Sequence, residues 1–231
     1  CTSGQQLDGG LYTTSDGGLT WARRIADTAI HEIAQDPTNR DIYWAASNQG
    51  IWRSTNNAVT WSKQTASGLP SANTGRTELA VAPSDGNYVY ALFENGDFWR
   101  TTNGGGSWSK MSSGACDGQC WYNMTLGVHR TNPNVVYRGT ILLFKTTNGG
   151  TTWNTLVNGW GGSQQVHQDM QAMLVDPAEP NKFYIGSDGG MWKSSDGGSS
   201  FVNMNATLNL FLFYAIDHQE YIKFIADSQL F

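Results

Sequence analysis

The chain has 231 residues, and 27 of them are glycine, while charged residues make up 14% and aromatic residues 12%. This content of large apolar side chains excludes a disordered chain, and the glycine content excludes a helical bundle, because each glycine inside a helix costs about 1 kcal/mol. The net charge of −5 offers no basic patch for nucleic acid, and no apolar run reaches the length of about 18 residues that spans a membrane. The composition therefore predicts one all-β domain with many turns.

The first residue, Cys1, has two interpretations. It is a candidate for a lipid anchor, since a bacterial lipoprotein is lipidated on its first cysteine after the signal peptide is removed. Alternatively, it marks an arbitrary boundary of the sequence or pairs with another chain, and we favour this second interpretation. No signal peptide is visible, so we expect the numbering to begin after processing or trimming.

One short element recurs five times, each time with a hydroxyl residue, an Asp or Asn two positions later, a small turn and a closing aromatic residue. Asn-Gly and Asp-Gly between β segments are the strongest short hairpin signal, because these residues accept positive φ angles. The closing aromatic residues are 40, 47, 45 and 48 residues apart. The five copies occupy residues 14–21, 54–61, 101–108, 146–153 and 194–201.

A second element precedes four of these copies. It consists of an apolar run, a turn that is often Asp-Pro or Asn-Pro, and a β-rich run around a tyrosine. The tyrosines are 47 residues apart each time, which indicates a regular repeat, and a further copy begins at residues 214–217. They are Tyr43, Tyr90, Tyr137 and Tyr184.

Each repeat therefore predicts four short antiparallel strands, which we call A to D in chain order. The apolar run forms strand A, the tyrosine run strand B, a short aromatic run strand C, and the residues after the recurring turn strand D. A unit of about 40–50 residues with four strands is one blade of a β-propeller. We expect a single propeller domain over 1–231, with complete repeats near 29–75, 76–121, 122–167 and 168–207.

The two ends of the chain leave the number of blades open. Residues 1–28 hold only a C–D half and residues 208–231 only an A–B half, so the halves could pair as a composite fifth blade. Such a blade would close the ring and remove exposed sheet edges. Alternatively, the chain is a fragment of a larger propeller, cut in the middle of a blade.

The recurring turn resembles the Asp box (BNR repeat) of sialidases, sortilin-type receptor propellers, xyloglucanase-type glycoside hydrolases and secreted bacterial propellers. The resemblance covers essentially the whole chain and implies a structural role, in which the Asp or Asn caps the C–D turn and the aromatic residue packs between strands. Two copies keep the acid and three have an amide, an exchange that a turn acceptor tolerates and a catalytic carboxylate does not. The residues are Asp16, Asn56, Asn103, Asn148 and Asp196, with the aromatic residues Trp21, Trp61, Trp108, Trp153 and Phe201.

Two further cysteines, Cys116 and Cys120, flank Gly118 in one loop. In an extracellular protein this spacing predicts a local disulfide, and the alternative is two reduced thiols. The neighbourhood offers no further ligands at metal-binding spacing, so we expect no metal here. We expect no cofactor elsewhere in the chain.

The D–A loops differ between repeats and lie on the face opposite the Asp boxes, which we call the top face. They cover residues 62–78, 109–124, 154–171 and 202–212. Polar and aromatic side chains that converge there on a central channel would suit a sugar. The expected ligand-binding residues are His31, Arg76, Trp121, Tyr122, Trp160 and His167, and the candidate catalytic residues are Glu32, Glu78 and Asp169.

His167 and Asp169 are two residues apart, so on a strand they would share one face. This pair could open a metal site, but Gln171 follows where a further histidine would be needed and is a poor transition-metal ligand, so we expect no metal. Alternatively, the aromatic residues fill the channel and His167 forms an internal hydrogen bond with Asp169.

Three classes of function compete. The first is a non-catalytic extracellular or cell-surface module that binds a glycan or a protein, or serves as structural material. The second is a sialidase-like or xyloglucanase-like glycoside hydrolase, which needs two carboxylates about 5–9 Å apart. Against it, the sequence has only eight arginines for the arginine triad of sialidases and lacks their Arg-Ile-Pro-type segment, and it holds at most one of the two propellers that form the cleft of xyloglucanases. The third, a photosystem assembly-factor propeller, would need a basic patch that is not evident. We favour the binding module.

Overall fold

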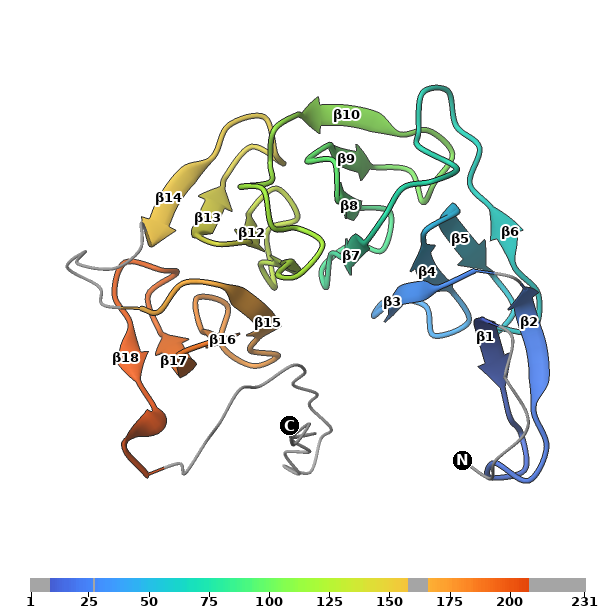
Figure 1. Ribbon diagram of the computed structural model, residues 1–231, viewed down its shortest axis with the longest axis horizontal. Helices are drawn as coiled ribbons and strands as arrows, with labels where there is room; N and C mark the ends of the chain where they lie inside the picture. Colours follow the sequence, from blue (N-terminus) through green and yellow to red (C-terminus); the bar gives the residue numbers. More distant parts are fainter. Residues whose placement is uncertain (1–8, 27, 158–165, 208–231) are drawn as a thin grey trace.

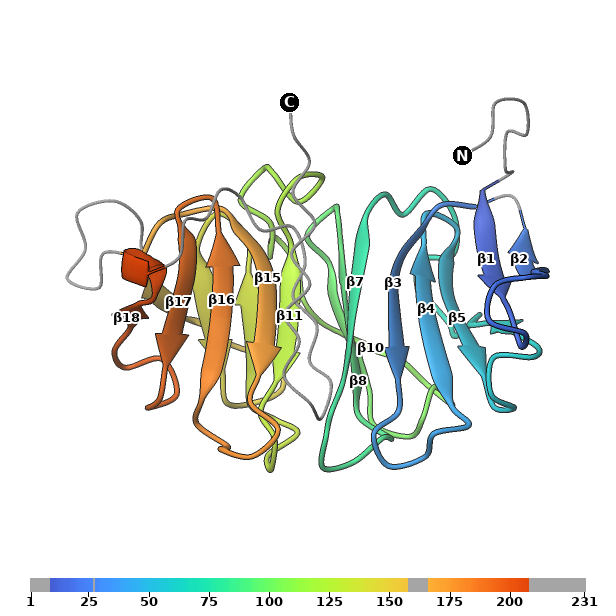
Figure 2. The ribbon, with the colours of Figure 1, turned by 90° about the horizontal axis from the view of Figure 1, so that it is seen from below.

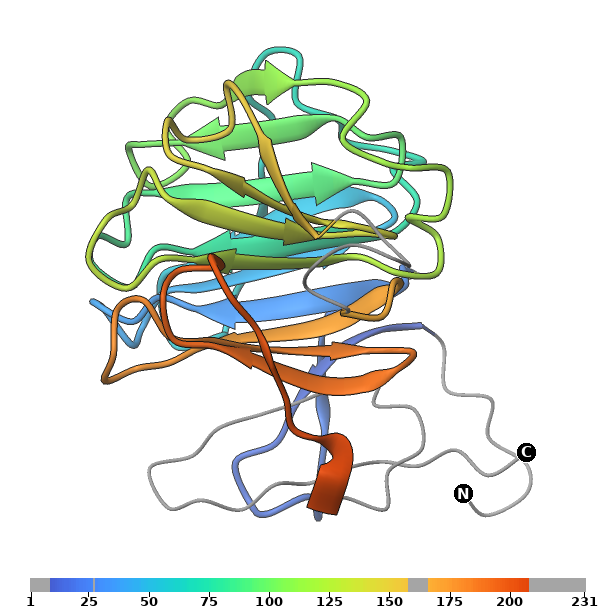
Figure 3. The ribbon, with the colours of Figure 1, turned by 90° about the vertical axis from the view of Figure 1, so that its left-hand side faces the viewer.

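A computed structural model of the chain describes residues 9–26, 28–157 and 166–207. Four antiparallel four-stranded sheets stand side by side around a common centre, each with its first strand innermost and its last strand outermost (Figure 1). The strands of all four sheets run between the same two faces of the molecule (Figures 2 and 3). The expected fold, an all-β propeller with four complete four-stranded blades, is confirmed.

The blades follow each other along the chain and are numbered 1 to 4. Blade 1 contains β3 (Ile30–Gln35), β4 (Tyr43–Ser47), β5 (Gly50–Ser54) and β6 (Ser62–Lys63). Blade 2 contains β7 (Thr77–Val81), β8 (Val89–Phe93), β9 (Phe98–Thr101) and β10 (Ser109–Ser112). Blade 3 contains β11 (Thr125–Val128), β12 (Val136–Gly139), β13 (Leu143–Thr146) and β14 (Asn154–Val157). Blade 4 contains β15 (Met170–Val175), β16 (Phe183–Ser187), β17 (Gly190–Ser194) and β18 (Val202–Asn203), followed by the short 3-10 helix η1 (Asn205–Thr207).

A separate hairpin of β1 (Gly10–Thr13) and β2 (Ala22–Ala26) packs beside blade 1 (Figure 1). Leu11 and Ile25 of this hairpin are buried with Ala45 of blade 1. The residues expected to complete a fifth blade with it, 208–231, lie outside the described residues. Within the described ranges, no helix is both long enough and apolar enough to cross a membrane.

The recurring turn forms the same hydrogen bonds in all five copies. In the first copy, Oδ1 of Asp16 accepts from the backbone N–H of Thr20 at 2.9 Å, and Oγ1 of Thr14 accepts from the N–H of Gly18 at 2.9 Å. The other four copies repeat both bonds at 2.8 to 3.1 Å. Each turn thus satisfies two backbone donors with short side-chain acceptors.

The exchange between Asp and Asn changes only the direction of one further bond. The hydroxyl of Thr20 donates to Oδ2 of Asp16 at 2.6 Å, whereas Nδ2 of Asn56 donates to the hydroxyl of Thr60 at 2.9 Å. A hydroxyl can rotate to serve as donor or acceptor. The turn therefore accommodates either residue without rearrangement.

The aromatic residue that closes each turn packs against the preceding blade. Trp108 of blade 2 meets Trp44 of blade 1 with ring centroids 5.9 Å apart, and Trp153 of blade 3 meets Phe98 of blade 2 at 5.0 Å. Trp21 belongs to the first hairpin, which has no preceding blade among the described residues, and it is 60% exposed. The clusters between adjacent sheets also contain Trp61 and Phe201.

In blade 1, the aromatic position of the second strand lies one residue away from the one that the tyrosine spacing predicts. Tyr90 pairs with Arg100, the residue just before the recurring turn, and the tyrosines of blades 3 and 4 pair in the same way. In blade 1, the residue in that position, opposite Arg53, is Trp44 and not Tyr43. Trp44 and Tyr90 are fully buried, so the position requires a large aromatic ring rather than a tyrosine in particular.

We predict that Gly150→Ala destabilises the protein more than Gly18→Ala, the same change at the same position of another turn. Both glycines have positive φ angles, 98° and 93°, at which a side chain costs about 1–2 kcal/mol. A Cβ at Gly150 would overlap the ring of Phe98 and add an overpacking cost of about 1–3 kcal/mol. At Gly18 the added atom meets only Trp21, at 3.7 Å.

Urea unfolding followed by tryptophan fluorescence measures both free energies. Blade 1 already has an alanine, Ala58, at this position with φ of 60°, so alanine is compatible with the turn itself. Equal losses of stability in the two variants would contradict the packing of this turn against the preceding blade.

Candidate functional site

Two carboxyl groups meet on the top face, at the seam between blades 1 and 2. Glu32 in β3 and Glu78 in β7 occupy equivalent positions in their blades. Glu32 pairs with Ala46, the fourth residue of β4, and Glu78 pairs with Leu92, the fourth residue of β8. In blades 3 and 4 this position is held by Thr125 and Ala172. Among the described blades, the carboxyl pair is therefore confined to one seam.

Glu32 and Glu78 share a proton through a side-chain hydrogen bond. Burial raises the pKa of Glu32 to about 7. Burial, followed by the negative charge of Glu32, raises the pKa of Glu78 to about 8. Two carboxylates in contact do not both ionise readily, so the pair holds one proton to a higher pH than a free glutamate would. Near neutral pH the pair carries about one negative charge.

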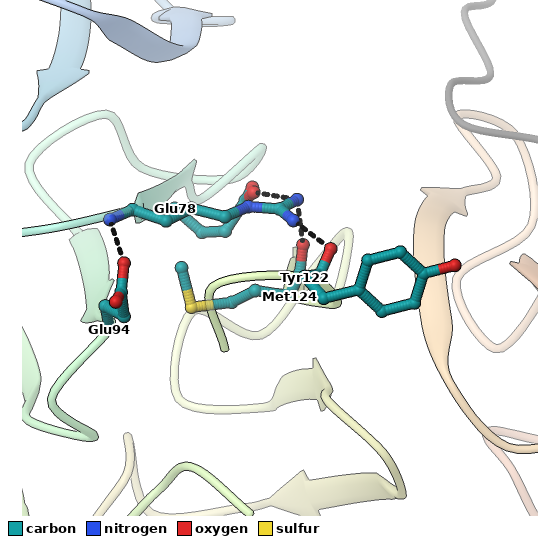
Figure 4. Close-up of polar contacts among 5 residues, drawn as sticks. Glu78, Glu94, Tyr122 and Met124 are labelled. Carbon is teal, nitrogen blue, oxygen red and sulfur yellow. Dashed lines mark hydrogen bonds and ion pairs between the residues drawn. The ribbon is translucent and has the colours of Figure 1, made fainter. Parts of the chain in front are cut away.

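Arg76 compensates this charge and connects blade 2 to blade 3 through contacts with Glu78, Tyr122 and Met124, which Figure 4 labels. Its Nη2 lies 3.0 Å from Oε1 of Glu78 and donates to the carbonyl oxygen of Met124 at 3.0 Å. Its Nη1 donates to the carbonyl oxygen of Tyr122, and its backbone N–H donates to Glu94 at 2.7 Å. The side chains of Arg76 and Glu78 are 25% and 10% exposed, so solvent screens this ion pair weakly.

A second cluster of polar side chains lies at the seam between blades 3 and 4. Nδ2 of Asn123 donates to Asp169 at 2.7 Å, and Nε2 of Gln171 donates to Asp188 at 2.9 Å. The hydroxyl of Tyr122 donates to Asp188 at 3.3 Å. Burial, and then the negative charge of Asp188, raise the pKa of Asp169. This seam therefore also brings two carboxyl groups near each other.

Tyr122 joins the two groups, because its carbonyl oxygen accepts from Arg76 while its ring extends toward blade 4 (Figure 4). The side chains form one continuous arrangement, which we call the top rim. The top rim consists of Glu32, Arg76, Glu78, Tyr122, Asn123, Asp169, Gln171 and Asp188.

The remaining residues expected at the site lie beside this rim or outside the described residues. Trp121 is 65% exposed, and its ring lies 5.7 Å from that of Tyr122. His31 lies at a β-bulge between Ile30 and Glu32; partial burial and then the charge of Arg76 lower its pKa, while Glu94 acts in the opposite sense. Trp160 and Cys1 are not among the described residues.

The expectation that His167 and Asp169 share one face of a strand is wrong. Asp169 precedes β15 and has a φ of 64°, so strand alternation does not apply to it. Its carboxylate accepts from Asn123, whereas Nδ1 of His167 lies 3.0 Å from the carbonyl oxygen of Gln168. Sequence reasoning also missed Asn123 and Gln171 as rim residues, although their positions at the beginning of strand A could have indicated them.

A disulfide joins Cys116 and Cys120, whose Cα atoms are 5.8 Å apart. It closes the loop just before Trp121, and Asp117 within this loop accepts from the hydroxyl of Thr140 at 2.6 Å. The loop that carries the exposed indole is thus fixed at two points. In the part of the chain that the structure describes, no three His, Cys, Asp or Glu side chains gather in a way that could hold a metal ion.

A family model described as Sortilin-Vps10 (sortilin, neurotensin receptor 3) matches residues 6–139, more than half of the chain. The chain belongs to the Sortilin-Vps10 family. No curated protein sequence matches it significantly. The expected resemblance to Asp-box propellers of the sortilin type is confirmed.

Solved structures of two kinds resemble this member of the Sortilin-Vps10 family. The GH74 enzyme of Niastella koreensis is 18% identical over 79% of this chain and 25% of its own, with a TM-score of 0.56. The GH74 xyloglucanase of Xanthomonas campestris is 16% identical over 77% of this chain and 30% of its own, also at 0.56. YCF48 bound to D1 peptide is 16% identical over 80% of this chain and 55% of its own, at 0.53. The chain thus spans about half the length of these proteins or less, and the likeness shows the fold alone.

We predict that the stability of the protein falls as the pH rises from about 4.5 to about 8. The two carboxyl groups ionise near 4.5 in the unfolded chain but hold protons to higher pH when folded. The folded state therefore binds more protons across this interval, and the free energy of unfolding decreases with pH. Glu78→Gln should remove much of the decrease, because an amide does not ionise.

Thermal unfolding at intervals across this pH range measures the effect. Glu179→Gln is the matched control, since Glu179 forms a surface ion pair with Lys182 and its side chain is 63% exposed. The control should keep the pH dependence of the parent protein. A parent-like dependence in Glu78→Gln would contradict the shared proton.

Proposed function

We propose that this chain acts as a non-catalytic binding module at the cell surface or outside the cell, with a glycan or protein ligand bound on the top face. The hydrogen bond between Glu32 and Glu78 carries this proposal. A glycosidase holds its two carboxyl groups about 5–9 Å apart, on either side of the bond that it breaks. Two carboxyl groups that are hydrogen-bonded to each other leave no room for a substrate between them.

The exposed indole of Trp121 supports a binding role. A tryptophan side chain that is 65% exposed leaves a large apolar surface in water, and such residues contribute strongly where ligands bind. The ring lies beside Tyr122, so an aromatic surface adjoins the hydrogen-bonding groups of the top rim. Both sugars and peptides can use this combination.

Two further observations support the location and the class of ligand. The disulfide between Cys116 and Cys120 favours an oxidising compartment, since such bonds persist mainly outside the cytosol. The matching family model is described as a receptor, and YCF48 was solved with a peptide bound. The likeness to GH74 enzymes leaves glycoside hydrolysis as the alternative that the test must exclude.

We predict that the protein releases no reducing sugar from xyloglucan, other β-glucans or sialosides. The reason is the contact between Glu32 and Glu78, which leaves this pair no room for a glycosidic bond between its members. Hydrolysis that disappears in Glu32→Gln or Asp169→Asn would overturn the proposal and identify an enzyme.

Glycan and peptide arrays, probed with the parent protein, should yield ligands that bind about tenfold or more weakly to Trp121→Ala. Trp21→Ala is the matched control, because Trp21 is 60% exposed but belongs to a turn on the bottom face. Ligands that respond to Trp21 and not to Trp121 would place binding elsewhere and contradict the proposal.

A further inference from the structure

The two seams of the top rim differ in how their negative charge is compensated. At the seam between blades 1 and 2, Arg76 pairs with Glu78 at 3.0 Å. At the seam between blades 3 and 4, the ion pairs formed by the described residues include neither Asp169 nor Asp188. Among the described residues, the second seam therefore presents two half-buried carboxyl groups without a lysine or arginine partner, although the charge of His167 lowers the pKa of Asp169 in opposition to burial.

A buried hydrogen-bond acceptor indicates that this seam also lacks donors. Asn123 is completely buried, and its Nδ2 donates to Asp169. Its Oδ1 has no hydrogen-bond partner, although nearly all buried polar atoms in folded proteins have one. The side chain faces into the same group of residues, so this group offers more acceptors than the protein supplies with donors.

The neighbouring surface is aromatic. Trp121 is 65% exposed, and the ring beside it belongs to Tyr122, whose hydroxyl donates to Asp188. The face of an indole attracts ammonium and guanidinium groups and covers the apolar stems that carry them. Carboxylates, an unpaired amide oxygen and an exposed indole all recognise the same chemistry, a cation on a carbon chain.

We propose that Asp169, Asp188 and Asn123, together with Trp121, bind a lysine or arginine side chain of a peptide segment in a partner protein. This proposal rests on the proposed binding function and names its ligand class. The cation supplies the donors and the positive charge that the seam lacks, while the indole packs on its aliphatic stem. At the other seam, Arg76 already occupies the corresponding place beside Glu78 and would repel such a ligand.

The test uses short peptides that differ only in the charged group. The folded chain is titrated with the pentapeptide acetyl-Gly-Gly-Lys-Gly-Gly-amide and with its arginine analogue, followed by tryptophan fluorescence. The matched peptides replace lysine by norleucine and arginine by citrulline, which keep the stem and remove the charge. We expect the uncharged peptides to bind about tenfold or more weakly, and added salt to weaken the charged ones.

The variants locate the site. Asp188→Asn and Asp169→Asn should each weaken the lysine and arginine peptides by about tenfold, and Trp121→Ala should also weaken them. Asp41→Asn is the matched control: it removes the same charge from an exposed turn between β3 and β4, on the bottom face, and should leave binding unchanged. Circular dichroism confirms that each variant keeps its strands.

Three outcomes would overturn the proposal. Equal affinity for the lysine and norleucine peptides would exclude charge recognition, and an unchanged affinity in Asp188→Asn would exclude this seam. A response to calcium or to spermine alone, without binding of the peptides, would show a site for a free cation and not for a partner protein. Failure of the underlying binding function is distinguishable, because it would appear as glycan hydrolysis that depends on Glu32.

Discussion

The packing of each turn aromatic against the preceding blade is the contact on which the rest of the structure depends. The short hydrogen-bonded turn fixes the backbone, and the ring that follows it, such as Trp108 or Trp153, then fills the space between two sheets. Every large buried cluster among the described residues lies between two adjacent sheets in this way. The angle between neighbouring blades, and with it the distance between innermost strands, follows from these contacts. The carboxyl pair of Glu32 and Glu78 is one result.

The repeat made the fold predictable, because each copy encodes the same local turn and the same strand order. In blade 1 the tyrosine spacing points to Tyr43, one residue from the position that faces Arg53, because the fold requires only a large ring there, and Trp44 supplies it. At the top face, the importance of Glu32, Arg76 and Glu78 could be anticipated from their places in strand A or directly before it. Their mutual contacts could not, because these depend on the relative register of two blades. The left-handed backbone at Asp169 likewise has no clear signal in the spacing of residues.

The carboxyl side chains at the two seams have different surroundings, and we expect them to have different roles. At the first seam, the two glutamates are buried, share a proton and lie beside Arg76, so that they form a contact between blades. At the second seam, the aspartates accept hydrogen bonds from the neutral side chains of Gln171 and Asn123, and among the described residues neither aspartate forms an ion pair with a lysine or arginine. Arg76 offsets the charge of the first seam inside the scaffold, whereas the aspartates of the second seam lie close to an exposed aromatic surface, an arrangement suited to recognition. The difference in charge compensation between the two seams therefore indicates which part of the top rim is suited to binding a ligand.

The exposure of Trp21 has a consequence for how the molecule opens. Since each buried cluster joins only adjacent sheets, cooperativity passes from neighbour to neighbour, as in a one-dimensional array. The first hairpin contributes to a single such cluster, whereas blades 1 to 3 each contribute to two. Its amide protons should therefore exchange with solvent through local fraying that leaves the inner blades intact. Local stability should therefore be lower at the hairpin than in blades 1 to 3, which hold the first seam of the top rim.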